Sequence, residues 1–163
     1  ERRNIVDAGT YNRKLYTLSG ASRMIYKHSP TQIGFDKGTP WVTDGAHLLT
    51  SPISFAIDGD VYVANSEGSI VKFASGKAVS FSISAVDPAI TSLSRIRTNS
   101  DTNYIYLLDQ KLKRIIIITK TGQLVSQITD EAWQSPSDFF VNEKTKTLYI
   151  IDSGMLLSGT LSI

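Results

Sequence analysis

Short apolar runs alternate with polar turns along the whole chain of 163 residues, and one of these runs recurs four times. Each copy has an aliphatic residue, a tyrosine, two further mostly apolar residues and then a small polar or acidic residue. The tyrosines are 46, 44 and 43 positions apart, and self-similarity at such a period is typical of a repeat architecture. The four copies are Leu15–Ser19, Val61–Asn65, Ile105–Asp109 and Leu148–Asp152.

The residues around each copy predict further strands. About ten residues upstream lies a short apolar run, and a polar turn such as Asp58–Asp60 separates it from the tyrosine strand, since Asp-Gly is a strong hairpin signal. A third strand follows each of the first three copies, and a fourth is expected at Val79–Ile83 and Leu124–Ile128. No segment shows a sustained helical stripe, although Asp130–Trp133 is expected to make one helical turn. The upstream strands are expected at Ile53–Ile57, Leu93–Ile96 and Phe139–Val141, with Ile5–Val6 a weaker match; the third strands are expected at Met24–Tyr26, Ile70–Phe73 and Arg114–Ile118.

Three or four short strands in each repeat of 43–46 residues predict an all-β fold made of β-propeller blades. The third copy matches a known pattern best, because Ile105–Asp109 is followed by Lys113-Arg114-Ile115 and then by Thr121-Gly122. Ser51-Pro52 and Ser135-Pro136 mark the starts of two blades. In this order of features the chain resembles the NHL-type and related six-bladed propellers. The resemblance implies a fold and has little specificity for function.

Four repeats account for the chain, so we expect a single β-propeller region over residues 1–163. Six blades of this length would need roughly 250 residues. We therefore interpret the chain as an incomplete propeller, the C-terminal part of a larger protein. Unpaired strands at the ends of such a ring invite pairing with another copy, so a homodimer of half-propellers is an alternative. The expected blades are residues 1–50, 51–92, 93–134 and an incomplete 135–163.

A second resemblance concerns the parent protein. Ile57–Val63, followed by Gly76-Lys77, is similar to propeller regions that lie C-terminal to membrane-anchored bacterial signalling proteins, some with a PPM-type phosphatase domain. This resemblance implies an extracytoplasmic part of a membrane-anchored bacterial protein, and it is compatible with an upstream catalytic domain.

The composition narrows the classes of function. The longest plain aliphatic run, Ile115–Ile118, is far shorter than the roughly 20 residues that cross a bilayer. The absence of cysteine excludes disulfides, thiolate catalysis and cysteine-based zinc sites. His28 and His47 have no partner at a metal-ligand spacing, so we predict no metal and no cofactor. The whole chain has a net charge of +2, and its basic first forty residues, which include Arg2 and Arg3, lack the aromatic interleaving of nucleic-acid binders.

Polar residues at the starts of the expected innermost strands differ between copies, and in a propeller these residues line the central channel. Variation of this kind on similar repeats favours a binding surface, here formed near Ser54, Arg95 and Asp138. Arg95 with Arg97 is predicted to hold an anionic group by charge-assisted hydrogen bonds. The alternative is an Arg95–Asp138 ion pair between neighbouring blades.

Two further groups of residues have both a functional and a structural interpretation. Trp41 and Trp133 pack between blades or, if they are exposed, act as contact anchors for a partner. Asn65, Asp109 and Asp152 recur at the ends of the tyrosine strands, where hydrogen bonds to the backbone of the next turn explain them without any ligand.

The leading hypothesis is a non-catalytic interaction or ligand-sensing module that binds a protein, peptide or glycan through its channel face. The alternative is a hydrolase or lactonase-like enzyme with a central metal, as in some six-bladed relatives. That chemistry needs several channel-facing carboxylates converging on one point, and Asp138 is the one fair candidate. We therefore predict no catalytic residues.

Overall fold

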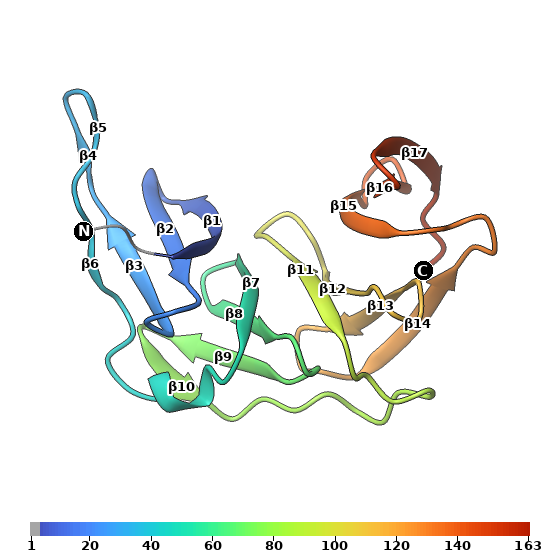
Figure 1. The fold of residues 1–163 in the computed structure, drawn as a ribbon, viewed down its shortest axis with the longest axis horizontal. Helices are drawn as coiled ribbons and strands as arrows, with labels where there is room; N and C mark the ends of the chain where they lie inside the picture. Colours follow the sequence, from blue (N-terminus) through green and yellow to red (C-terminus); the bar gives the residue numbers. More distant parts are fainter. Residues whose placement is uncertain (1–3) are drawn as a thin grey trace.

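The computed structural model describes residues 4–163, in which four antiparallel sheets follow one another along the chain as the blades of an incomplete β-propeller (Figure 1). Arg2 and Arg3 lie outside the described residues. The first strand of each sheet contacts the first strand of the next, so β1, β7, β11 and β15 form the inner row. The first and last sheets lie at opposite ends of an open arc (Figure 1).

Each sheet is a meander of consecutive strands, apart from one inserted hairpin. The first sheet comprises β1 (Ile5–Tyr11), β2 (Lys14–Ser19), β3 (Met24–His28) and β6 (Thr39–Pro40). The second comprises β7 (Pro52–Ile57), β8 (Val61–Asn65), β9 (Ile70–Ala74) and β10 (Lys77–Val79). The third comprises β11 (Leu93–Arg97), β12 (Tyr104–Asp109), β13 (Arg114–Thr119) and β14 (Leu124–Thr129). Within the described residues the fourth has three strands, β15 (Pro136–Asn142), β16 (Thr147–Asp152) and β17 (Met155–Thr160).

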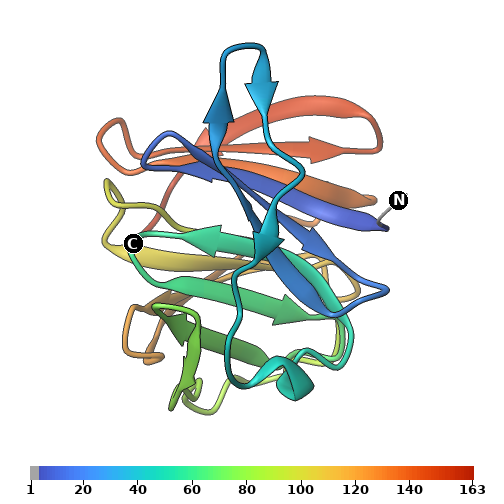
Figure 2. The same cartoon turned by 90° about the vertical axis from the view of Figure 1, so that its left-hand side faces the viewer.

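Besides β6, a hairpin and a short helix were not predicted. The hairpin of β4 (Pro30–Thr31) and β5 (Gly34–Phe35) projects from the first sheet (Figure 2), and a short 3-10 helix, η1 (Ala46–Leu48), precedes the second sheet. In residues 4–163, no helix is long and apolar enough to cross a membrane.

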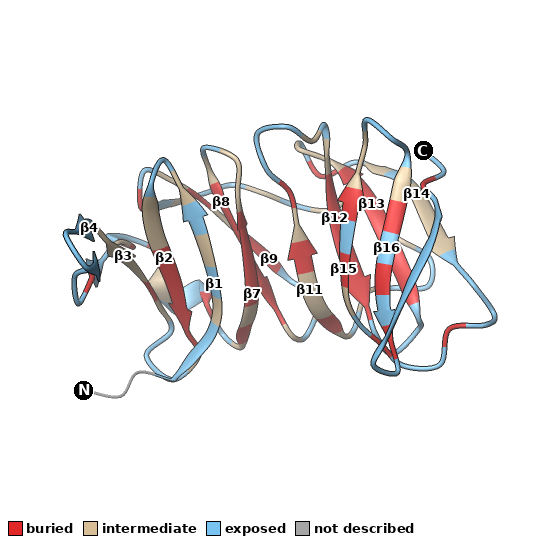
Figure 3. Ribbon diagram, turned by 90° about the horizontal axis from the view of Figure 1, so that it is seen from above, coloured by how far each residue is buried: buried red, intermediate tan, exposed pale blue. Residues whose placement is uncertain are grey.

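The hydrophobic core lies between the sheets, because the central strands of the second and third sheets are covered by a neighbouring blade on both faces (Figure 3). Successive side chains of a strand point to opposite faces, so the recurrent tyrosine faces the following blade. Tyr62 and Tyr106 are 1% and 0% exposed there, whereas the equivalent Tyr149 of the last sheet is 37% exposed. The face of the fourth sheet that carries Tyr149 is uncovered among the described residues.

The expected fourth strand at Val79–Ile83 is wrong. The strand β10 ends at Val79, and the following residues cross to the third sheet, where Ser84 N donates to Gly122 O at 2.8 Å. Gly122 has a φ of +91°, and a side chain there would collide with the Ser82 carbonyl. The hydrogen bonds that would have extended β10 are made instead with the neighbouring blade.

The expected helical turn at Asp130–Trp133 is also wrong. These residues form a turn closed by a hydrogen bond from Trp133 N to Asp130 O, and the chain enters β15 directly afterwards.

A single carboxylate joins the third and fourth sheets at one end of their strands. Glu143, in the turn after β15, accepts hydrogen bonds from Asn103 N at 2.9 Å and from the Tyr106 hydroxyl at 2.8 Å. Burial and this hydrogen bond to Glu143 raise the pKa of Tyr106. Tyr106 therefore contacts the next blade through a hydrogen bond as well as filling the core between the two blades.

Candidate functional site

The same irregularity occurs in all four inner strands and sets the geometry of the channel face. Between the first and second strand of each sheet, the register shifts by one residue, as in a β-bulge. The residue that follows the shift is Asp7, Ser54, Arg95 or Asp138. Asp7 was not among the expected site residues, because the first inner strand was expected to cover only Ile5–Val6, whereas β1 extends to Tyr11.

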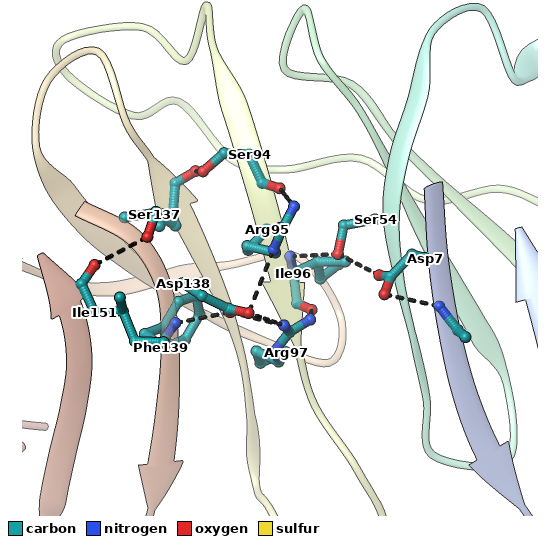
Figure 4. Close-up of polar contacts among 12 residues, drawn as sticks. Asp7, Ser54, Ser94, Arg95, Ile96, Arg97, Ser137, Asp138, Phe139 and Ile151 are labelled. Carbon is teal, nitrogen blue, oxygen red and sulfur yellow. Dashed lines mark hydrogen bonds and ion pairs between the residues drawn. The ribbon is translucent and has the colours of Figure 1, made fainter. Parts of the chain in front are cut away.

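On the first three blades these residues connect neighbouring inner strands through hydrogen bonds (Figure 4). Asp7 Oδ2 accepts from Ser54 Oγ at 2.7 Å and from Phe55 N at 2.9 Å. Ser54 Oγ in turn accepts from Ile96 N at 3.3 Å. The side-chain oxygen of the residue after the bulge thus accepts a hydrogen bond from a backbone N–H of the next blade. This contact occurs between the first and second blades and again between the second and third.

The third blade changes this pattern because a guanidinium has no acceptor. Arg97 Nη2 donates to Asp138 Oδ1 at 2.7 Å and to Oδ2 at 2.9 Å, whereas Arg95 Nε lies 3.5 Å from Oδ2. An ion pair does connect the blades, but the principal partner of Asp138 is Arg97 rather than Arg95. Each of these side chains is about one third exposed, so this contact leaves them accessible to solvent.

Two guanidinium groups share one carboxylate here, so this part of the face has an excess positive charge. Arg95 also donates from Nη1 to Ser94 O at 2.9 Å, and Arg97 donates from Nη1 to Ile96 O at 3.1 Å. These bonds hold both side chains along the inner strand β11. Because an arginine carries five N–H donors, part of the Arg95 guanidinium is available to another acceptor.

A hollow of about 260 Å³ crosses the inner strands β1, β7 and β11. Asp7 and Arg97 place opposite charges on its lining, and Ala56, Thr98 and Asn99 also line it. The channel face therefore combines a concave surface with charged groups of both signs.

A larger hollow of about 470 Å³ lies elsewhere, beneath residues 81–86 at the outer side of the second blade. Its lining is aliphatic, aromatic or small, as with Ile70, Phe81 and Ile83, and it includes no charged side chain. We place the candidate site on the channel face because the charged groups gather there.

Both tryptophans that sequence analysis weighed as contact anchors pack in the cores between blades. Trp133 is 5% exposed, between the third and fourth sheets. Trp41 is partly buried, with its ring centroid 6.0 Å from that of Tyr16 and 6.4 Å from that of Phe73. In the structure, both tryptophans therefore lie between blades rather than on the surface as contact anchors.

The strand-end residues Asn65, Asp109 and Asp152 also have structural contacts. Asn65 Oδ1 accepts from Ser51 N at 3.2 Å, and Asp152 Oδ1 accepts from Ser135 N at 2.6 Å, so both hold the Ser-Pro dipeptide that starts their own blade. Asp109 Oδ1 accepts from Leu112 N at 3.2 Å in the turn after its strand, as expected, and Asp109 Oδ2 forms a buried ion pair with Arg114 at 2.9 Å.

The described residues contain no group of three or more His, Asp or Glu side chains placed to hold a metal ion. On the channel face, Asp7 lies on β1 and Asp138 on β15, the two ends of the inner row.

Comparison with known proteins finds similarity in structure alone. No protein family and no curated protein matches the sequence. Among solved structures, hydrazine synthase from Kuenenia stuttgartiensis is similar with a TM-score of 0.71 and 13% identity, over 98% of this chain and 46% of that chain. The WD40 β-propeller domain of Doa1 has a TM-score of 0.67 and 11% identity, over 97% and 52% of the two chains. A chain of a nidogen–laminin complex has a TM-score of 0.66 and 16% identity, over 91% and 57%.

These similarities place the chain in the class of β-propeller folds. It spans about half the length of the structures that it matches, in agreement with an incomplete propeller. These neighbours include an enzyme, a WD40 β-propeller domain and a protein solved in a complex, and identities of 11–16% show a shared fold and nothing about function.

Proposed function

We propose that this chain is a non-catalytic interaction module that binds a polar peptide segment of a partner protein on its channel face. The observation that supports this function is the hollow across β1, β7 and β11, with Asp7 and Arg97 on its lining and Arg95 beside it. An extended peptide offers backbone donors and acceptors together with charged side chains. Such groups complement a channel face that carries both positive and negative side chains. An acidic side chain is the expected partner of Arg95.

Selection from a displayed library of random twelve-residue peptides, with a glycan array probed in parallel, tests this function. Peptides that carry a carboxylate are expected to bind the wild type at least tenfold more tightly than the Arg95→Gln variant. Lys111→Gln is the matched control, because it removes one positive charge from an exposed turn outside the hollow. Equal binding to the Arg95→Gln variant, or selection of glycans alone, would overturn the proposal.

The parent protein is part of the same proposal. We infer a longer ring of the NHL-type, six-bladed kind, within the extracytoplasmic part of a membrane-anchored bacterial protein. The half-length match to solved propellers and the uncovered face of the last blade support further blades, whereas the location rests on the resemblance of Ile57–Val63 alone. Light scattering at several concentrations tests it, because a stable dimer would favour two half-rings that close each other, whereas a monomer agrees with further blades in the same polypeptide.

A further inference from the structure

The connection between β10 and β11, residues 80–92, crosses from the second blade to the third (Figure 1). Beneath it lies an outer hollow of about 470 Å³, which is within the roughly 300–1,000 Å³ of small-molecule sites. The lining comes from Gly68, Ser69 and Ile70, where β9 begins, and from residues of the connection itself. All of these residues belong to the second blade or to its link with the third, so the walls of the hollow involve neither end of the chain.

Hydrogen bonds to the third blade hold the connection in place. Ser84 N donates to Gly122 O at 2.8 Å, in the turn before β14. Further along, Arg114 Nη2 donates to Pro88 O at 2.7 Å. These two contacts lie on the part of the connection that lines the hollow and directly after it. The hollow is therefore formed before any ligand binds, which reduces the ordering cost of binding.

The lining of the outer hollow suits an uncharged ligand. Ile70, Phe81 and Ile83 supply apolar surface, and the described residues that line the hollow include no charged side chain. A charged ligand would lose hydration there without gaining an opposite charge. Ser82 also lines the hollow, and within residues 4–163 no other group forms a hydrogen bond with its hydroxyl. This hydroxyl is available to donate to an acceptor on a ligand.

The junction between the second and third blades also differs from the other two junctions in its aromatic residue. The segment that connects the first two blades inserts Trp41 beside the recurrent Tyr16, with the ring centroids 6.0 Å apart, and the segment before the fourth blade inserts Trp133. Here the connection carries the smaller Phe81, whose ring centroid is 5.6 Å from that of the recurrent Tyr62. The outer hollow lies beside Phe81, so a ligand there extends the apolar packing at a junction that has no indole.

We propose that the outer hollow binds a small, uncharged, largely apolar molecule that carries a hydrogen-bond acceptor such as a carbonyl. The apolar part of the ligand packs against Ile70 and Phe81, and the Ser82 hydroxyl donates to its acceptor. Ala85 and Ala89, which line the hollow, are small and exposed, so the ligand enters from solvent on their side. This site is separate from the channel face, because no residue of β1, β7, β11 or β15 lines it.

The test uses prodan, an uncharged naphthalene dye with a ketone group, whose fluorescence reports its transfer from water to an apolar site. Fluorescence titration measures its affinity for the wild type and for two variants, after circular dichroism has shown that each variant is folded. Ala85→Phe fills the hollow, and Ser82→Ala removes the proposed donor. Ala21→Phe is the matched control, because it makes the same substitution at an exposed position outside the hollow. Methyl naphthoate and the naphthoate anion serve as competitors that differ in charge.

Prodan is expected to bind the wild type and the Ala21→Phe variant alike, with one site per chain. Its affinity is expected to fall at least tenfold for Ala85→Phe and at least threefold for Ser82→Ala. Both variants are expected to fold normally, because both positions are exposed. The uncharged ester is expected to displace prodan at a concentration at least tenfold lower than the anion does. No saturable binding, unchanged affinity for either folded variant, or equal displacement by the anion would overturn the proposal.

Discussion

Replacement of Asp109 by asparagine removes one charge from the most buried ion pair of the protein's described residues. The Asp109 and Arg114 side chains are 0% and 3% exposed, and Arg114 donates to Asp109 Oδ2 from both Nε and Nη2, at 3.0 and 2.9 Å. Arg114 also donates to Gln127 Oε1 and to Pro88 O, each at 2.7 Å. The guanidinium therefore joins β12 and β14 of the third blade to the segment before β11, and it stays buried when its counter-charge is lost.

The expected cost follows from that burial. Removing one partner of a buried pair leaves an uncompensated charge and typically costs about 3–5 kcal/mol, whereas replacing both partners with apolar residues is often nearly neutral. Asp109→Asn is therefore expected to lower the free energy of unfolding by about 3–5 kcal/mol, a large share of the roughly 5–15 kcal/mol of an ordinary domain. The double variant Asp109→Leu/Arg114→Met is expected to lose less than Asp109→Asn alone.

Urea unfolding followed by tryptophan fluorescence measures these differences, because buried Trp133 packs against the third blade and reports its loss of structure. Urea is uncharged, so it leaves the ion pair unscreened. Asp101→Asn, in an exposed loop of the same blade, is the matched control and is expected to change stability by no more than about 0.5 kcal/mol. A loss below about 1 kcal/mol for Asp109→Asn would refute the reasoning, as would a double variant that is less stable than Asp109→Asn.

Three further predictions concern other polar contacts. Arg97→Gln is expected to cost no more than about 1 kcal/mol in the same urea assay, because its ion pair is about one third exposed; a loss of several kcal/mol would contradict this. The raised pKa of Tyr106, caused by burial and by the Glu143 hydrogen bond, keeps its phenol protonated where the unfolded chain ionises. Stability is therefore expected to fall as the pH rises above about 10, and thermal melts of Tyr106→Phe should show a shallower fall than the wild type. Burial opposes ionisation of Glu67, but hydrogen bonds from Ser51 and Thr50 outweigh it and lower its pKa from 4.5 to about 2. The stability that this carboxylate contributes is present above pH 4.5 and is lost as the pH falls toward 2, so acid titrations of Glu67→Gln should lack this component.

Much of the fold could be predicted from the sequence because the information is local. Alternating apolar residues, the Asp58–Asp60 turn and the four tyrosine strands each depend on neighbours a few positions apart, and β8, β12 and β16 lie at or within one residue of the expected copies. The expected strand at Val79–Ile83 was wrong for the opposite reason. Ser84, directly after this segment, forms hydrogen bonds with Gly122 and Leu124, about forty residues away, and residues close by in the sequence do not indicate that pairing.

In the candidate site, too, some features could be predicted from neighbouring residues and others depended on contacts between distant segments. Arg95 and Asp138 could be selected as variable polar residues at the starts of inner strands, and Arg97 as a second cation near Arg95, but their pairing depends on the bulge within each strand and on the spacing of two blades. Asp7 gave no signal, because its role arises only where β1 lies beside β7. The amino-acid sequence by itself determined an all-β repeat with its turns and its alternating faces, since these follow from residues close together in the chain. Only the tertiary structure decided which charges meet across the blades, because these contacts depend on registers between segments some forty residues apart.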